Sequence, residues 1–260
     1  FRKKNFKNLK KIFKKVKLYK CDFNDYSSTK KILNKIKPCA IFHLASNADV
    51  RLSFDNPKEI INNNNNITLN LLEAVRKLKI DPIILICSTS EVYGTVKIEN
   101  TPISERNMLN PASPYAVSKT FQDLLSQTYY KNFNLKIIIT RMFSYFNSRR
   151  NNLFSSNWAN QIADIERGKL KILRHGNLNS IRTIIGINDA MEAYWKAATL
   201  GKIGQIYNIG GGKTIKIKKI GNEKKCLTFR WSKAKLDGKI VDDNSYTYCP
   251  KKGFTKMVSH

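Results

Sequence analysis

The chain has 260 residues, of which 42% are hydrophobic and 10% aromatic, which is enough to bury a sizeable core and excludes a disordered composition. Its 47 Lys and Arg against 19 Asp and Glu give a net charge of +28. Such charge is typical of proteins that bind nucleic acid or anionic membranes, but no helix-turn-helix, zinc-finger or aromatic RNA-binding signature accompanies it. We therefore expect a solvated basic surface with no nucleic-acid or membrane partner. Polyanion binding is kept as the least favoured hypothesis for the function of the chain.

The five cysteines contain no C-x-x-C pair and have no neighbouring His, so neither a metal site nor a disulfide framework is expected. No apolar run approaches the roughly 18 residues of a membrane span. Residues 1–20 lack the apolar core of a signal peptide. These features predict a cytoplasmic protein.

Apolar runs and amphipathic stretches alternate along most of the chain. The spacing of apolar residues predicts helices over 28–36, 57–78, 114–130, 158–168 and 189–199. Short β-rich runs predict strands over 39–45, 83–87, 135–140, 170–173 and 206–209. Ser113 and Asp189 are candidate helix caps, and Trp158 and Trp195 have the spacing of core residues. The alternation predicts an α/β fold, a doubly wound Rossmann-like parallel sheet.

The pattern decays after about residue 220. We expect residues 1–220 to form the α/β domain. Residues 221–260 have many charges and no clean helix signal, and they are left as an unassigned basic tail.

The segment Tyr115-Ala-Val-Ser-Lys119 has the most informative chemistry. Positions i and i+4 share a helix face, so the Lys ammonium would favour the phenolate form of Tyr115 and make it a general base. Thr89 and Glu91 follow a predicted buried strand, at the end where α/β sheets bind their ligands. These four residues are the catalytic candidates.

Four strings, in order along the chain, resemble the motifs of the extended short-chain dehydrogenase/reductase family of nucleotide-sugar epimerases and dehydratases. They are C-D-F-N-D at 21–25, F-H-L-A-S at 42–46, the N-to-A segment 64–74 and S-P-Y-A-V-S-K at 113–119. The resemblance implies NADP as coenzyme, with NAD possible. It makes residues 1–220 an NAD(P)-binding domain, with a small substrate-binding portion from about residue 145. It implies coenzyme contacts at Asp22, Phe23, Leu44, Ala45, Ser46, Asn64, Tyr115, Lys119, Tyr145 and Arg150.

Within the family, the string S-T-S-E-V-Y-G at 88–94 is most similar to that of the GDP-mannose 4,6-dehydratases. The resemblance implies that Tyr115, with Lys119 and Thr89, removes the proton of the sugar 4-hydroxyl as C4 is oxidised by the coenzyme. Glu91 then removes the C5 proton as water leaves C6, and the hydride returns to C6. Ser90 and Arg182 would contact the nucleotide-diphosphate sugar. A 4-reductase or an epimerase of the same family is the alternative.

The family opens with a G-x-x-G-x-x-G turn, and this sequence contains none. Its first recognisable element resembles the third strand of the family, so we expect the first βαβ unit, about 40 residues, to be missing. An inactive truncated remnant is therefore the second hypothesis. The resemblance also implies a homodimer or tetramer that pairs through the helices at 57–78 and 114–130.

Overall fold

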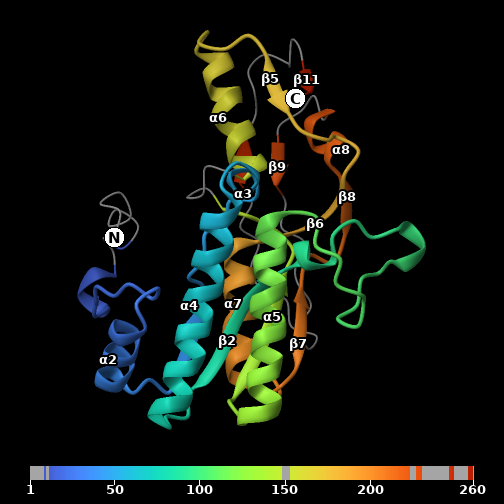
Figure 1. Cartoon of the computed structure of the whole chain (residues 1–260). Helices are drawn as coiled ribbons and strands as arrows, with labels where there is room; N and C mark the ends of the chain where they lie inside the picture. The colour runs from blue at the N-terminus through green and yellow to red at the C-terminus, as the bar shows by residue number, and fades with distance from the viewer. Residues whose placement is uncertain are drawn as a thin grey trace. The chain divides into compact units, whose positions relative to one another are not determined.

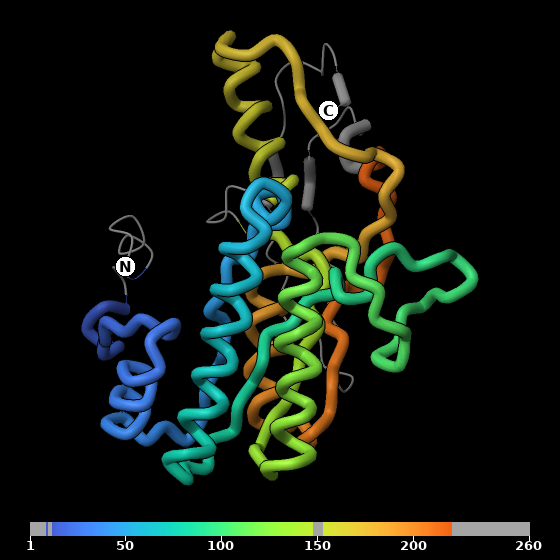
Figure 2. The backbone as a smooth tube through the Cα atoms, in the orientation of Figure 1, coloured from blue at the N-terminus to red at the C-terminus, as the bar shows by residue number. Residues whose placement is uncertain are grey.

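The computed structural model describes Leu9, residues 12–147 and 153–222, and three short strands at 227–229, 246–248 and 257–259. The chain divides into two compact units (Figures 1 and 2). One comprises Phe1–Arg141 with Lys196–Tyr207, and the other Met142–Trp195 with Asn208–His260. The division predicted at residue 220 stays a prediction. Arg150 and most of the predicted tail lie outside the described residues.

The main sheet has four strands in the order β1-β2-β3-β7. These strands are β1 (Ala40–His43), β2 (Ile83–Thr89), β3 (Ile137–Met142) and β7 (Ile206–Ile209). The β1 and β2 strands pair in parallel, from Ala40 opposite Ile83 to His43 opposite Ile86. Near-continuous apolar runs suit such strands, because helices cover the sheet. The predicted α/β class with a parallel sheet is confirmed.

Two long helices, α4 (Pro57–Leu78) and α5 (Pro114–Phe133), run side by side in front of β2 (Figure 1). The predicted cap at Ser113 is confirmed, because its hydroxyl accepts a hydrogen bond of 3.1 Å from the amide of Ala116. Pro114 follows at the first helical position, where its missing N–H costs nothing. The shorter α2 (Tyr26–Ile36) packs against α4 and is capped by Asp25.

One apolar core joins α2, α4, β2, β3 and α5 in the first unit. Its large buried members on the sheet and on α4 are Leu71, Leu72, Val75, Ile84, Ile86, Ile137 and Ile139. Each contributes about 1.5–3 kcal/mol on burial, before the entropy cost of folding. This core holds α4 and α5 against the sheet.

Short elements connect these layers. They are η2 (Phe13–Lys15), α3 (Val50–Asp55), η3 (Ser90–Tyr93) and η4 (Ile98–Asn100). Gly94 ends η3 with φ +63°, and a Cβ there would lie 1.8 Å from the carbonyl oxygen of Asn110. Only glycine fits this close approach.

The second unit has a three-stranded sheet in the order β4-β6-β8. Its strands are β4 (Ser144–Phe146), β6 (Ile181–Gly186) and β8 (Thr214–Lys216), with β4 parallel and β8 antiparallel to β6. A small core of Trp158, Ile162, Leu173 and Ile217 joins α6 (Phe154–Glu166) to β5 (Leu173–His175) and α8 (Ile217–Asn222). In addition, β5 pairs with β11 (Met257–Ser259), and β9 (Leu227–Phe229) with β10 (Tyr246–Tyr248).

Three expectations are wrong in detail. The strand expected over 170–173 is β5, which begins at Leu173. The last helix, α7 (Ile187–Leu200), begins before Asp189, which therefore lies in its first turn and is not its cap. Trp195 is 62% exposed on α7, whereas Trp158 is buried as expected. Among the described residues, no helix has the length and apolarity to cross a membrane.

Candidate active site

Hydroxyl groups gather where β2 ends. Thr89 is half-buried, and its Oγ accepts a hydrogen bond of 3.3 Å from the amide of Glu91, which caps η3. The Oγ of Ser88 is buried and has no hydrogen-bond partner in the part of the chain that the structure describes. Ser90 is half-buried, and Glu91 is exposed one residue later. This end of β2 therefore offers hydroxyls and a solvent-facing carboxylate within four consecutive residues.

The α5 helix carries Tyr115 and Lys119, and it contacts both β2 and η3. Tyr115 is buried, and Lys119 is only 3% exposed. The Nζ of Lys119 donates a hydrogen bond of 2.6 Å to the carbonyl oxygen of Cys87 on β2. Burial lowers the pKa of Lys119 to about 8, although Cys87 and Asp123 act in the opposite direction. The structure thus brings the predicted Tyr–Lys helix to the β2 end that carries Thr89.

A buried polar chain lies behind these residues. The Nε2 of His43 is 2.8 Å from Thr68 Oγ1, which also accepts from the side-chain amide of Gln122 at 2.5 Å. Burial, together with the charge of Lys119, lowers the pKa of His43 to about 3. The imidazole is therefore neutral at physiological pH and ties β1 to α4 and α5.

Asn64 lies inside this interior. Its Oδ1 accepts from the amide of Asn47 at 2.7 Å, and its Nδ2 donates to the Asn47 carbonyl and to Ser118 Oγ. The fully buried side chain thus anchors the segment after β1 to α5. The coenzyme contact predicted for Asn64 stays a prediction.

The remaining coenzyme candidates of the first unit follow β1 or precede α2. Leu44 and Ala45 are exposed and Ser46 is half-buried, immediately after β1. Asp22 is exposed and accepts hydrogen bonds from the backbone and side chain of Asn24, while Phe23 packs against the core. Because β1 and β2 are parallel, the segments after them leave the same edge of the sheet.

The second unit carries the other candidates. Arg182 is exposed on β6 and lines a hollow of about 200 Å³. The other lining residues are Phe154, Trp158, Gly176, Asn177, Ser180 and Ile217. Tyr145 is half-buried on β4. The structure therefore gives Arg182 a concave setting, as a substrate contact requires.

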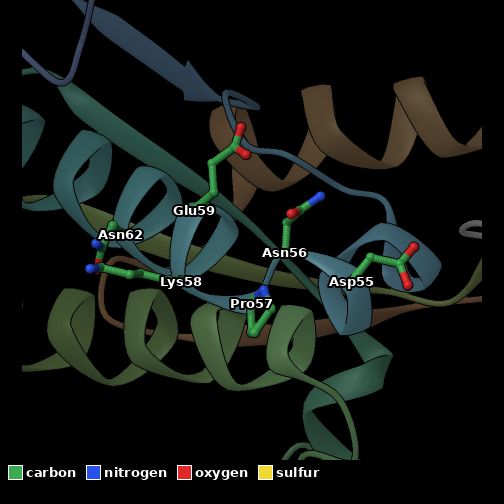
Figure 3. A pocket seen from close by; sticks show the side chains of 6 residues that line it. All are labelled: Asp55, Asn56, Pro57, Lys58, Glu59 and Asn62. Atoms are coloured by element: carbon green, nitrogen blue, oxygen red, sulfur yellow. The ribbon is translucent and has the colours of Figure 1, made fainter.

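Another hollow, of about 470 Å³, opens where α3 meets α4 (Figure 3). It is lined by Asp55, Asn56, Pro57, Lys58, Glu59 and Asn62. None of these is a predicted site residue. Among the described residues, no group of three or more His, Cys, Asp or Glu side chains could hold a metal ion.

A buried ion pair was not anticipated from the sequence. Arg141, on β3, donates from Nε and Nη2 to the two carboxylate oxygens of Asp123 at 2.9 and 3.1 Å. Its Nη1 donates to the hydroxyl of Tyr93 on η3 at 2.9 Å. An arginine in the apolar run Ile-Ile-Ile-Thr-Arg-Met was the available signal, since a buried charge needs a partner.

Residues 1–250 match the family model described as GDP-mannose 4,6 dehydratase. The chain is 31% identical to a dTDP-D-glucose 4,6-dehydratase of Dictyostelium discoideum over 79% of this chain and 49% of that protein. It is 30% identical to a GDP-mannose 4,6 dehydratase of Drosophila melanogaster over 70% of this chain and 46% of that protein. The chain thus spans about half the length of these curated relatives.

The fold is also similar to a solved structure, that of RMD from Pseudomonas aeruginosa complexed with NADPH. The TM-score is 0.74 at 25% sequence identity, over 82% of this chain and 75% of that one.

Proposed function

The chain belongs to the GDP-mannose 4,6-dehydratase family of nucleotide-sugar dehydratases, reductases and epimerases, and we propose that it dehydrates a GDP-mannose-like nucleotide sugar with NADP as coenzyme. The observation that carries the proposal is the buried Lys119 ammonium on the same helix face as Tyr115, against the end of β2. The hydroxyl of Thr89 and the carboxylate of Glu91 follow at that end.

A dinucleotide coenzyme fits the residues present at this edge of the first unit. Ser88, near the end of β2, has a buried hydroxyl with no hydrogen-bond partner among the described residues, and the exposed small residue Ala45 follows β1. Such ligands bind where parallel strands like these end. Bound there, the coenzyme would supply a hydride acceptor for C4 of the sugar. Leu44, Ala45 and Ser46, with Tyr115 and Lys119, are the proposed contacts of the first unit; Asp22 and Phe23 are proposed at the adenine.

Two residues of the chain carry out the two proton transfers of the proposed reaction. Tyr115 takes the proton of the 4-hydroxyl, and the nearby ammonium of Lys119 stabilises the phenolate. Thr89 donates a hydrogen bond to the same oxygen. Glu91 takes the C5 proton, which a 4-ketone makes acidic, and this step separates a dehydratase from a 4-reductase. Ser90 and Arg182 are proposed substrate contacts, and the fork of Arg182 suits paired phosphate oxygens.

The first experiment is a fluorescence titration with NADPH, and with NADH as the second coenzyme, on the wild-type chain and Tyr115→Phe. We expect saturable micromolar binding by both proteins, and GDP-mannose turnover that is about 10²–10⁴-fold slower in Tyr115→Phe than in the wild type. Glu91→Gln should keep C4 oxidation and lose dehydration. A wild-type chain that binds no coenzyme up to millimolar concentration would exclude the active enzyme and favour the inactive remnant.

Self-association is a second expectation that the surface of α4 and α5 supports. Val117, Phe121 and Leu124 are exposed on α5 at helical spacing, and Leu69 is exposed on α4. Unpartnered apolar side chains on neighbouring helices favour burial against a second copy. Sedimentation of the wild type should show a dimer or tetramer, and Phe121→Glu a monomer. Phe54→Glu, on the exposed side of α3, is the matched control and should not change the mass.

A further inference from the structure

The η3 turn, which carries Glu91, accepts three hydrogen bonds, and two of them come from distant segments of the chain. The amide of Gly94 donates to the carbonyl of Glu91 at 3.1 Å, and the amide of Asn110 to the carbonyl of Val92 at 2.9 Å. The hydroxyl of Tyr93 receives the third bond, from Arg141. These bonds fix η3 at Glu91, Val92 and Tyr93, although the side chain of Glu91 is exposed.

Arg141 is at the centre of this arrangement. Its residue is 2% exposed, and four of its five N–H groups are accounted for, because Nη1 donates both to Tyr93 and to the carbonyl of Glu105 at 2.9 Å. The guanidinium also lies over the Tyr93 ring, 5.1 Å from its centroid. One side chain on β3 therefore contacts η3, the loop after η4 and α5.

The other end of the arrangement is the helix of the proposed general base. Asp123, which is fully buried, lies one helical turn after Lys119 and two after Tyr115 on α5. Its two oxygens accept a forked pair from Arg141, a geometry that sets orientation as well as distance. Asp123 also accepts from Gln127 at 2.9 Å, so the carboxylate has little freedom to move.

We propose that Arg141, acting through Tyr93 and Asp123, is a positioning residue that holds the turn of Glu91 in register with the helix of Tyr115 and Lys119. The inference rests on the proposed function, in which Glu91 and Tyr115 act on adjacent carbons of one sugar ring. Two groups with such roles must keep their spacing, because a displacement of about 1 Å can cost 10²-fold in rate. A guanidinium that donates four hydrogen bonds, two of them to one carboxylate, supplies that rigidity.

The test removes the hydrogen bond between Arg141 and Tyr93 and keeps the ion pair between Arg141 and Asp123. Tyr93→Phe removes the hydroxyl that Arg141 bonds, whereas the bonds from Arg141 to Asp123 remain. Tyr129→Phe is the matched control, since it removes a buried tyrosine's hydrogen bond to Glu73 (3.0 Å), which links α5 to α4 elsewhere in the first unit. Both variants lose one hydroxyl and keep the aromatic ring.

Hydrogen–deuterium exchange decides the positioning role without substrate. We expect the amides of Gly94 and Asn110 to exchange about tenfold faster in Tyr93→Phe, and to be unchanged in Tyr129→Phe, because a bond from a charged donor holds the turn closed. Unchanged exchange in Tyr93→Phe, or acceleration spread equally over α5 and the sheet, would overturn the proposal.

The rates of the two chemical steps in the active enzyme provide a second test. In Tyr93→Phe, wash-in of solvent deuterium at C5, the step of Glu91, should slow by roughly ten- to hundredfold, while C4 oxidation, the step of Tyr115, should match the Tyr129→Phe control. Equal slowing of both steps would mean a merely structural role and would overturn the proposal. A wild-type chain without turnover would refute the proposed function alone, and the exchange measurement would still decide the role of Arg141.

Discussion

Lys119 and Arg141 are buried cations of the same unit, 3% and 2% exposed, yet their surroundings differ. Among the described residues, Lys119 has no carboxylate within ion-pair distance and donates to the carbonyl of Cys87. Its burial lowers its pKa to about 8. Burial also opposes the charge of Arg141, but Asp123 and Tyr93 together outweigh it and raise the pKa of Arg141.

The difference separates a reactive charge from a structural one. A cation that is bonded to a carboxylate and to further acceptors keeps its charge and its place. A cation that lacks a counter-ion lies close to its own deprotonation, and small changes in its surroundings alter its charge. Proton chemistry needs a cation without a counter-ion, such as Lys119. A fixed spacing between two catalytic segments needs a paired cation, such as Arg141. The comparison can be sharpened by removing each cation in turn.

The largest effect is expected for Arg141→Met. This change leaves the carboxylate of Asp123 buried without its partner, and breaking a buried pair in this way costs about 3–5 kcal/mol of the free energy of unfolding. Arg141→Met combined with Asp123→Leu removes both charges and should recover most of that loss. Urea denaturation of the three proteins at neutral pH measures both values. If the single variant were as stable as the double variant, Asp123 would not depend on Arg141.

Long periodic elements were predictable from the sequence. Helix α4 begins and ends where its apolar spacing predicts, because its buried residues recur at helical spacing from Ile60 to Val75. Strand β7 also has the predicted bounds. The pairing of Tyr115 with Lys119 on one helix face was equally local, since it depends on a spacing of four residues. Thr89 and Glu91 were predicted from their position after a buried strand, and the structure has the helix of Tyr115 and Lys119 in contact with β2 and η3, which carry them.

Short strands and long-range bonds were not predictable. Strands β4 and β8 have three residues each, too few to show a period, and they exist through pairing with β6. Lys119 bonds a carbonyl 32 residues away, and Arg141 a carboxylate 18 residues away on another element. Such contacts depend on how α5 packs on the sheet, which no local pattern of residue types contains.

A smaller effect is expected from Lys119→Met, and it depends on pH. In the folded chain Lys119 releases its proton near pH 8, whereas in the unfolded chain its ordinary pKa is 10.5. Between these values the unfolded state binds more protons, so the wild type gains stability as pH rises, by about 3 kcal/mol in total. Below pH 8 both states are protonated and the burial penalty is present in full, so Lys119→Met should be more stable than the wild type there.

The difference in unfolding free energy between the wild type and Lys119→Met, measured from pH 7 to pH 10.5, isolates this group from the other lysines. Lys131→Met removes a charge from an exposed position of the same helix and is the control; its difference from the wild type should change little with pH. A flat difference for Lys119→Met as well would mean that the ammonium has a counter-ion in solution. In that case Lys119 would resemble Arg141, and its charge would hold structure in place instead of stabilising the phenolate of Tyr115.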